Sequence, residues 1–288
     1  MRGPHNIWRL IRTGATLERT GAMKVVLDAF EAPAPVRFVA RALGLPFQFL
    51  GYKGDPSMPP ATRALTALGP AYIKFGQILS TRPDVVGDEL AVQLRVLQDK
   101  LPPFSVQKAK AEVEKELGVS VDSVFSEFSE PVAAASIAQV HKAKLADTGE
   151  YVAVKVLRPG IERAFNKDVD AFYLAARMVD LFAPGARRLR PMEVIEHFDG
   201  VVQGELDLRL ESSAASEFEA NTKDDAGFEL PQIKWDLSAR RVMTLGWAEG
   251  VPLGDNAALD AAGHNRVDLG NRVLQLFLNH ALRDGYFH

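Results

Sequence analysis

The sequence of 288 residues contains no cysteine, which excludes disulfide bonds, thiolate zinc sites and a cysteine nucleophile. It also lacks any apolar run near the ~18 residues that a membrane-spanning helix needs. The longest weakly polar segment, residues 64–79, is interrupted by Thr66 and Lys74. No secretory signal is visible at the N-terminus, so we expect a cytoplasmic or membrane-peripheral chain.

The chain also lacks a large excess of either positive or negative charge. Arg and Lys number 34 against 37 Asp and Glu, and the net charge of −3 provides no whole-chain case for a nucleic-acid partner. No Gly-x-Gly-x-x-Gly fingerprint occurs, and the six histidines are scattered without an i, i+4 pair. A hydroxylase therefore has little support. The 47% of hydrophobic residues is ordinary for a globular protein and sufficient for a sizeable core.

The first 60 residues mix short apolar clusters with arginine and proline. Within residues 1–30, Arg and Lys number five and Asp and Glu two. A basic amphipathic helix of this kind can lie on an anionic membrane surface. It can equally pack on the next domain with its charged face in water, and both interpretations stay open. Three prolines and two glycines in residues 51–60 indicate a linker.

Further along the chain, the spacing of the apolar residues changes from one typical of helices to one typical of strands and back. A spacing of three and four predicts helices over residues 61–79, 88–98, 105–117, 162–182, 192–222 and 267–282. Alternation predicts strands over residues 132–145 and 151–157, joined by a turn at residues 147–149, and a second hairpin from residues 230–235 and 241–247. This order of elements indicates an α+β protein.

A lysine lies in the middle of the clearest predicted strand, where Val154 and Val156 flank Lys155. An isolated lysine on one face of a sheet must reach water or meet an anion. Protein kinases place such a lysine on their third strand, where it holds the α- and β-phosphates of ATP. The alternative is a solvated edge-strand lysine, because the string Val-Ala-Val-Lys alone is a weak match.

Four small residues precede Lys155 by 19–22 positions, between two strand-like segments: Ala133, Ala134, Ala135 and Ser136. This is where a kinase places the loop that covers phosphate, and glycines there let backbone N–H groups approach the ligand. Alanine still permits approach but is stiffer and does not adopt positive φ cheaply. A plain small-residue turn is the alternative.

Three carboxylates occur within seven residues of a predicted helix, at Glu205, Asp207 and Glu211. They would repel one another unless they meet cations or metal. A kinase uses a helical glutamate to pair with the strand lysine and fix its position. A solvated acidic face is the alternative, and it loses weight because leucines lie between the acids.

Five segments between residues 60 and 288 carry a resemblance in collinear order. They are Lys74-Phe75-Gly76-Gln77-Ile78-Leu79-Ser80-Thr81-Arg82, Leu97-Gln98-Asp99, Pro131-Val132-Ala133-Ala134-Ala135-Ser136-Ile137-Ala138-Gln139-Val140-His141, Val152-Ala153-Val154-Lys155-Val156 and Glu205-Leu206-Asp207. In combination they resemble the UbiB family, atypical protein-kinase-like proteins associated with ubiquinone biosynthesis. The resemblance implies a kinase-like N-lobe, a small antiparallel sheet with inserted helices, preceded by a helical extension.

The resemblance also implies roles for individual residues. Lys74 and Gln77 match the family's Lys-x-Gly-Gln signature, which folds over the active site and restricts access of protein substrates. Glu205 and Asp207 match a family-specific acidic pair near the nucleotide and the signature. A lysine inserted from another helix would find opposite charge at these two acids.

For the nucleotide, the resemblance implies that Lys155 is the phosphate-binding lysine and Glu211 its helical partner. The implied cofactor-binding residues are Ala133, Ala134, Ala135, Ser136, Lys155 and Trp247. The implied cofactors are ATP or ADP with Mg²⁺. Where the family has a glutamate before the hinge tryptophan, this chain has Gly246, so adenine binding through backbone groups is expected with altered geometry.

The chain ends at His288, where family members continue into a segment with the catalytic aspartate and the metal-binding asparagine. We therefore expect a fragment with no metal ligands of its own, weak nucleotide binding and negligible ATPase activity. The expected division is residues 1–60, an amphipathic and linker segment; 61–118, the helical extension; 119–248, the kinase-like N-lobe; and 249–288, the start of a helical C-lobe.

The resemblance implies an ATP-dependent phosphotransferase or ATPase that supports ubiquinone biosynthesis, peripheral at the inner membrane. Its implied partners are the nucleotide, a membrane surface or quinone-precursor lipid, and quinone biosynthesis proteins. The alternative is a non-catalytic scaffold or lipid-handling module that serves the same partners at the membrane.

Overall fold

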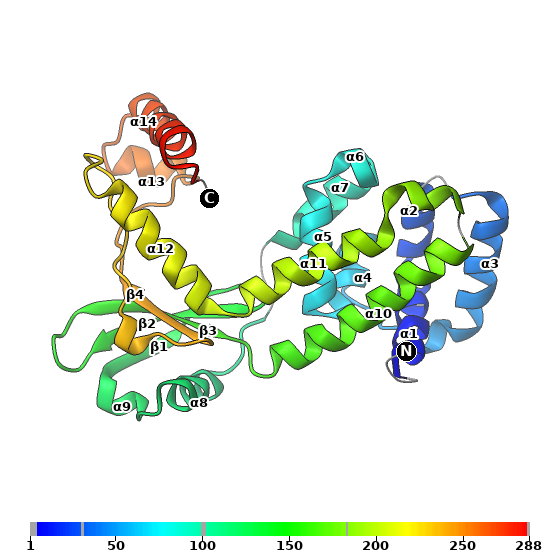
Figure 1. The fold of residues 1–288 in the computed structure, drawn as a ribbon, viewed down its shortest axis with the longest axis horizontal. Helices are drawn as coiled ribbons and strands as arrows, with labels where there is room; N and C mark the ends of the chain where they lie inside the picture. Colours follow the sequence, from blue (N-terminus) through cyan, green and yellow to red (C-terminus); the bar gives the residue numbers. More distant parts are fainter. Residues whose placement is uncertain (1–4, 30–31, 99–101, 183, 287–288) are drawn as a thin grey trace. The chain divides into compact units, whose positions relative to one another are not determined.

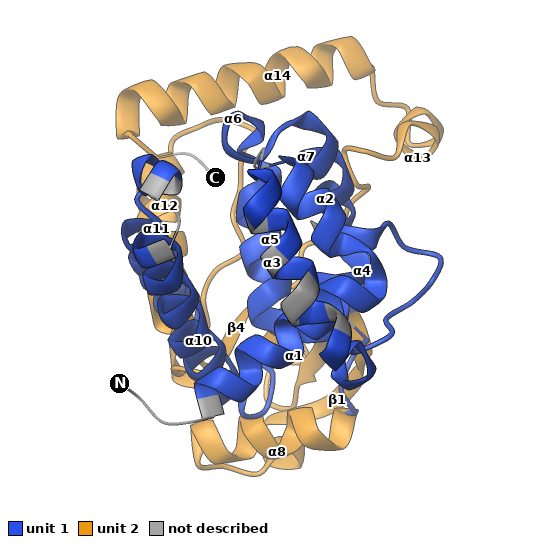
Figure 2. Cartoon of the chain, turned by 90° about the vertical axis from the view of Figure 1, so that its right-hand side faces the viewer, with its two compact units in different colours: residues 1–105, 133–139, 157–206 blue, residues 106–132, 140–156, 207–288 orange. Residues whose placement is uncertain are grey.

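The structure is a computed structural model that describes residues 5–29, 32–98, 102–182 and 184–286. Asp99 of the Leu97-Gln98-Asp99 segment and the last residue, His288, lie outside the described residues. The chain divides into two compact units (Figure 2). Unit 1 comprises residues 1–105, 133–139 and 157–206, and unit 2 comprises residues 106–132, 140–156 and 207–288.

The elements of unit 1 are helical apart from the strand ends that it includes. They are α1 (His5–Thr20), α2 (Ala22–Ala29), α3 (Ala34–Gly44), η1 (Leu45–Leu50), α4 (Pro60–Leu68), α5 (Pro70–Ser80), α6 (Pro83–Val86), α7 (Asp88–Arg95), η2 (Val96–Gln98), α10 (Ile161–Phe182), η3 (Pro184–Leu189) and α11 (Pro191–Glu205). The single helix expected over residues 61–79 is two helices, because Gly69 between them has φ 118°. Pro70 then begins α5, where its missing N–H costs nothing.

Two apolar clusters hold unit 1 together. Helices α4, α5, α6 and α7 with η2 bury Ala61, Ile73, Val86, Leu90, Ala91, Leu94 and Leu97. An aromatic group joins α5 to α10 and α11, with Phe172 in contact with both Tyr72 and Phe75, at centroid distances of 4.7 and 5.4 Å. Phe198 packs edge-on against Phe75 at 5.2 Å. Helix α5 is therefore packed on both sides, and its Lys-x-Gly-Gln signature lies on a rigid element.

Unit 2 combines a sheet with flanking helices. Its elements are α8 (Val106–Leu117), α9 (Val121–Val124), β1 (Phe125–Ala134), β2 (Ala138–Leu145), β3 (Tyr151–Leu157), α12 (Leu208–Thr222), η4 (Trp235–Leu237), β4 (Val242–Gly246), α13 (Asn256–Ala261), α14 (Arg266–Asn279) and the short π-helix η5 (His280–Asp284). The strands lie in the order β1-β2-β3-β4. The α+β class is confirmed.

The two faces of the sheet differ. On β3, Val152, Val154 and Val156 are fully buried, whereas Lys155 points to the opposite face because side chains alternate along a strand. Strands β3 and β4 are antiparallel, and Lys155 is paired with Met243. Helices α8 and α12 lie on opposite sides of the sheet (Figure 1). The valine face therefore supplies apolar packing, and the other face carries the lysine.

Several sequence-based boundaries were wrong. The helix expected over residues 192–222 is divided into α11 and α12, since the buried Leu206 and the capping Asp207 interrupt it. The second hairpin has one full strand, β4, and its partner is reduced to an isolated bridge between Ile233 and Leu245. Strand β1 begins at Phe125, before the expected start at residue 132. Half of its residues are exposed and they carry no clear alternation, so the pattern did not indicate a strand there.

His141 is a buried histidine in the centre of the sheet. Its ring is fully shielded, its Nδ1 lies 2.8 Å from the Ser129 carbonyl oxygen, and it stacks on Phe128 at 4.7 Å. Burial lowers the pKa of His141 below the ordinary 6.5, although the Ser129 carbonyl opposes this shift. The folded state thus favours the neutral ring, while the unfolded chain takes up a proton as the pH falls below about 6.5.

We therefore predict that His141 contributes a loss of stability as the pH falls from about 7.5 to 5.5, and that His141→Asn removes this contribution, so the melting temperature of the variant relative to wild type rises as the pH falls. Asparagine retains a donor near the Nδ1 position and does not titrate. The measurement is the melting temperature at each pH. His264→Asn, at an exposed histidine of the same unit, should leave the slope unchanged. An identical slope in His141→Asn and wild type would contradict the assignment.

Candidate functional site

The centre of the candidate site is an ion pair between strand β3 and helix α12. Lys155 Nζ lies 2.6 and 2.7 Å from the two carboxylate oxygens of Glu211, in the first turn of α12. The contact expected between these two residues is thus present, although they are 56 positions apart. The lysine side chain is 26% exposed and the glutamate 48%. A pair so accessible to water stabilises a fold by about 0–1 kcal/mol, so it remains open to an incoming anion at little cost.

Asp207 holds the start of α12 one turn before Glu211. As N-cap, its carboxylate accepts a hydrogen bond from the Arg209 N–H at 3.1 Å and pairs with the Arg209 guanidinium at 2.6 Å. The hydrogen bonds from the Arg209 guanidinium lower the pKa of Asp207. The Leu208 N–H donates to the Arg240 carbonyl oxygen at 2.9 Å, just before β4. Asp207 and Glu211 therefore have separate tasks: the first begins the helix, and the second meets Lys155.

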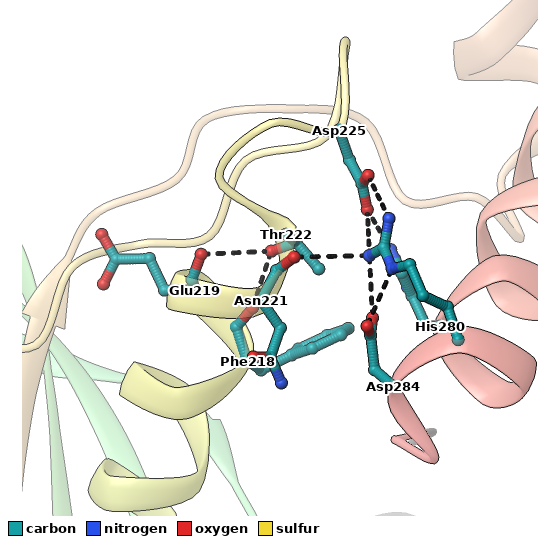
Figure 3. Close-up of polar contacts among 8 residues, drawn as sticks. Phe218, Glu219, Asn221, Thr222, Asp225, His280 and Asp284 are labelled. Atoms are coloured by element: carbon teal, nitrogen blue, oxygen red, sulfur yellow. Dashed lines mark hydrogen bonds and ion pairs between the residues drawn. The ribbon is translucent and has the colours of Figure 1, made fainter.

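The other end of α12 is tied by charge and aromatic packing (Figure 3). Asp225, just beyond the helix, accepts hydrogen bonds from Arg283 at 2.7 and 2.9 Å and lies 3.0 Å from His280 Nε2. Phe218 of α12 packs edge-on against the His280 ring at 4.9 Å. The hydrogen bonds from Arg283 lower the pKa of Asp225 to about 2. Both ends of the helix that carries Glu211 are therefore fixed within unit 2.

Trp247 lies at the exit of β4. The backbone N–H of Trp247 donates to the Tyr151 carbonyl oxygen at 3.0 Å, which extends the pairing with β3. Lys142 Nζ lies 4.6 Å from the centroid of the Trp247 ring and 4.4 Å from that of Tyr151. Glu249 completes the group, with its carboxylate 3.7 Å from the same ammonium. The Trp247 ring is thus held by a cation, and its expected part in nucleotide binding stays a prediction.

The alanine-rich loop belongs to unit 1 and lies at the turn between β1 and β2. Ala133 and Ala134 end β1, and the Ala135 N–H donates to the Ala138 carbonyl oxygen at 2.8 Å. Arg190 is the one non-glycine residue at positive φ in the part of the chain that the structure describes, so none of the loop residues through Ser136 needs a glycine conformation. Alanine therefore fits this loop without backbone strain.

The Lys-x-Gly-Gln signature lies on α5 within unit 1. Lys74 Nζ is 2.5 Å from the Glu205 carboxylate, so one half of the expected acidic encounter is present. Gln77 donates from Nε2 to the Leu97 carbonyl oxygen at 2.9 Å, which ties α5 to η2. Lys74 thus meets a member of the acidic pair, while the contact of Gln77 is with a neighbouring helical turn.

Glycine is required in this signature for packing. A Cβ at Gly76 would collide with side-chain carbons of Leu65 and Leu97, and Leu94 would lie just beyond them. These leucines belong to the helical core of unit 1. The absence of a side chain at Gly76 lets α5 approach α4 and α7 closely.

Three arrangements carried no sequence signal: the Lys142 cation between two rings, the tie of Asp225 to Arg283, and the hydrogen bonds of Arg158, described below. Each relies on a cation whose partner is distant in sequence, so no local spacing indicates it. Among the described residues, no group of three or more His, Cys, Asp or Glu side chains converges as a metal site would require. None of the helices in the described ranges combines the length and apolar character needed to cross a membrane.

The comparisons with known proteins agree with this geometry. Residues 96–288 match the ABC1 atypical kinase-like domain. The chain belongs to the ABC1 atypical kinase-like family. The expected kinase-like N-lobe is thereby confirmed, with four strands and flanking helices.

Relatives of this ABC1 domain are similar over most of the chain. A "Probable protein kinase UbiB" of Marinobacter nauticus is 41% identical over 78% of the chain and 41% of that protein. The protein of the same name from Aeromonas salmonicida is 35% identical over 99% of the chain and 52% of that protein. The chain thus spans about half the length of the curated relatives it matches.

One solved structure is similar as well. It is that of Rv3197 from Mycobacterium tuberculosis in complex with erythromycin, with a TM-score of 0.53 and 28% identity. The match covers 75% of this chain and 54% of the other. It supports the kinase-like fold of the ABC1 domain.

We predict that Gly76→Ala destabilises the ABC1 chain by about 1–3 kcal/mol, because the new methyl group overpacks the leucines around α5. The measurement is urea unfolding. Gly200→Ala is the matched control: Gly200 lies inside α11, where a Cβ would meet nothing within 4 Å. That control should be neutral or slightly stabilising, since alanine favours a helix. Equal stability of Gly76→Ala and wild type would contradict the packing argument.

Proposed function

We propose that this ABC1 domain binds the phosphates of ATP or ADP with Lys155, and that Glu211 holds the lysine in position. The observation that carries the proposal is the ion pair between them, which is partly exposed and joins a strand to a helix that is fixed at both ends. Phosphoryl transfer depends on positioning and on neutralised charge, and a strand lysine with a helical glutamate is the kinase arrangement for both.

The fold supports this use of the pair over a purely structural one. The valines on the opposite face of β3 are fully buried, and each such side chain is worth about 1.5–3 kcal/mol of apolar burial. The exposed pair adds at most about 1 kcal/mol to the fold. Stability alone therefore gives little reason for a lysine at position 155, whereas an anionic ligand gives a direct one.

The proposal includes Mg²⁺ only as the partner of the nucleotide. The described residues offer no converging group of metal ligands, so the ion has no protein ligand assigned in this part of the chain. When bound to the nucleotide, Mg²⁺ supplies positive charge to the phosphates. Lys155 contributes one further positive charge at the phosphates. The expected role of the alanine-rich loop in nucleotide binding stays a prediction.

For the whole protein we propose a UbiB-like kinase or ATPase that supports ubiquinone biosynthesis. The curated relatives named "Probable protein kinase UbiB" support this assignment. Its partners are then proteins of quinone biosynthesis and a quinone-precursor lipid at the inner membrane.

Lys155→Met should weaken binding of Mg-ATP at least about tenfold, because a hydrogen bond to a charged group is worth about 1.5–3 kcal/mol. The measurement is a titration of the melting temperature with Mg-ATP. Glu211→Gln should weaken it less, since the ammonium remains but loses its positioning partner.

Lys234→Met provides the matched control. Lys234 pairs with Glu150 at 2.8 Å in the same unit, and its side chain is 27% exposed, close to the value for Lys155. It should bind Mg-ATP as wild type does. Equal binding by Lys155→Met and wild type would overturn the proposed function.

A second candidate function is contact with an anionic membrane surface through unit 1, as a scaffold or lipid-handling module would make. Trp8, Phe49 and Tyr52 are exposed large aromatic residues of α1, η1 and the segment that follows. The Arg12 guanidinium lies 5.7 Å from the Trp8 ring and 5.4 Å from the Tyr52 ring, and Arg19 donates to the Phe49 carbonyl oxygen at 3.3 Å. Aromatic and basic groups together suit the interface of an anionic bilayer.

In a flotation assay, we predict that the chain binds vesicles containing anionic lipid and that the double variant Trp8→Ser and Phe49→Ser lowers binding roughly tenfold, since burying one large apolar side chain is worth about 1.5–3 kcal/mol. Trp235→Ser, at an exposed tryptophan of unit 2, should leave binding unchanged. Equal binding to neutral vesicles, or no effect of the double variant, would exclude this second function.

A further inference from the structure

The turn between β1 and β2 has little packing of its own to fix its shape. Ala133 and Ala135 are exposed, and Ser136 is half-buried. One backbone hydrogen bond closes the turn, from the Ala135 N–H to the Ala138 carbonyl oxygen. Small exposed side chains bury little apolar surface, so the conformation of this loop has to be imposed by its neighbours.

Arg158, the residue that follows β3, imposes the conformation of this loop. Its guanidinium donates from Nε and Nη2 to the Ala135 carbonyl oxygen, at 3.3 and 3.0 Å, and from Nη1 to the Pro102 carbonyl oxygen at 3.0 Å. The Arg158 N–H donates to the Ile137 carbonyl oxygen at 2.8 Å. Both the backbone and the side chain of this arginine are thus bonded to the turn, and the planar guanidinium fork fixes a direction as well as a distance.

The arginine itself rests on a fixed support within unit 1. Its Cζ lies 5.7 Å from the centroid of the Phe104 ring. The Phe104 backbone in turn exchanges two hydrogen bonds with the side-chain amide of Gln139, at 3.0 and 3.1 Å, and Gln139 is 1% exposed. The Pro102 carbonyl and the Phe104 ring are therefore tied to β2, and they hold the guanidinium beneath the loop.

The orientation of one peptide follows from this. A trans peptide directs its C=O and its N–H to opposite sides, and no peptide bond in the described residues is cis. Because the Ala135 carbonyl points to Arg158, the N–H of Ser136 in the same peptide points away from it. That N–H is a donor turned to the other side of the loop, as a phosphate-binding loop requires.

We infer that Arg158 is a positioning residue for the alanine-rich loop and that it holds the Ser136 N–H as a donor for a phosphate group. The inference rests on the proposed nucleotide function and adds the group that holds the loop in shape. Kinases with glycine-rich loops gain close approach from a flexible backbone. Here the loop has no glycine, and an arginine brace supplies a fixed orientation.

The experiment compares Arg158→Met, which keeps the length of the side chain but loses the fork, with wild type. Binding of Mg-ATP should weaken at least about tenfold, as expected when a charged hydrogen-bond donor is removed. Binding of adenosine, which has no phosphate, should stay unchanged. Hydrogen exchange of peptides covering residues 133–138, measured without nucleotide, should become faster. Arg158→Lys has one charged donor group in place of the guanidinium fork. Its affinity for Mg-ATP and its exchange rate should lie between those of Arg158→Met and wild type.

Arg163→Met is the control, because Arg163 is an exposed arginine of α10 five positions further along; it should match wild type in all three measurements. Equal weakening of ATP and adenosine in Arg158→Met, or unchanged exchange of residues 133–138, would overturn the inference and leave the proposed function standing. A wild-type chain that binds no Mg-ATP would overturn the proposed function and the phosphate role of Ser136. The exchange measurement would still decide whether Arg158 holds the loop.

Discussion

The ammonium of Lys155 against the carboxylate of Glu211 is the interaction on which the functional interpretation of this fold depends. The pair is partly exposed, so it contributes little to holding the sheet and the helix together. The dependence runs the other way: buried valines on one face stabilise the sheet, and capping and charge fix both ends of α12. These stronger interactions place the Lys155 ammonium and the Glu211 carboxylate at a position that water reaches. The phosphates of the proposed nucleotide would meet the ammonium there.

The α5 signature requires a glycine, whereas the loop between β1 and β2 has alanines where kinases have glycines. In the α5 signature, Gly76 is needed because leucines occupy the space of its missing Cβ. In the loop between β1 and β2, where kinases use glycines, no described residue adopts positive φ, and alanine satisfies the backbone. An alanine loop has fewer accessible conformations than a glycine loop, so ordering this loop costs less conformational entropy.

The sequence predicted the pairing of Lys155 with Glu211 because the resemblance to a known family named both partners. It also predicted α8, which Gly118 ends at φ 70°. The division at Leu206 was missed because apolar positions continue through it, and only burial distinguishes that residue. The brace at Arg158 was missed for another reason: its partners are backbone carbonyls, and a carbonyl has no identity in a sequence.

The junction between α11 and α12 explains why one acid of the pair meets a lysine of unit 1. Glu205 is the last residue of α11, where the negative end of the helix dipole opposes a carboxylate, so Glu205 needs a cation and has Lys74. Asp207 is the N-cap of α12, where the dipole and a backbone N–H favour a carboxylate. Two acids separated by one residue therefore differ in what stabilises their negative charge. The start of α12 favours the carboxylate of Asp207, whereas the end of α11 disfavours that of Glu205, and the Lys74 ammonium offsets this cost.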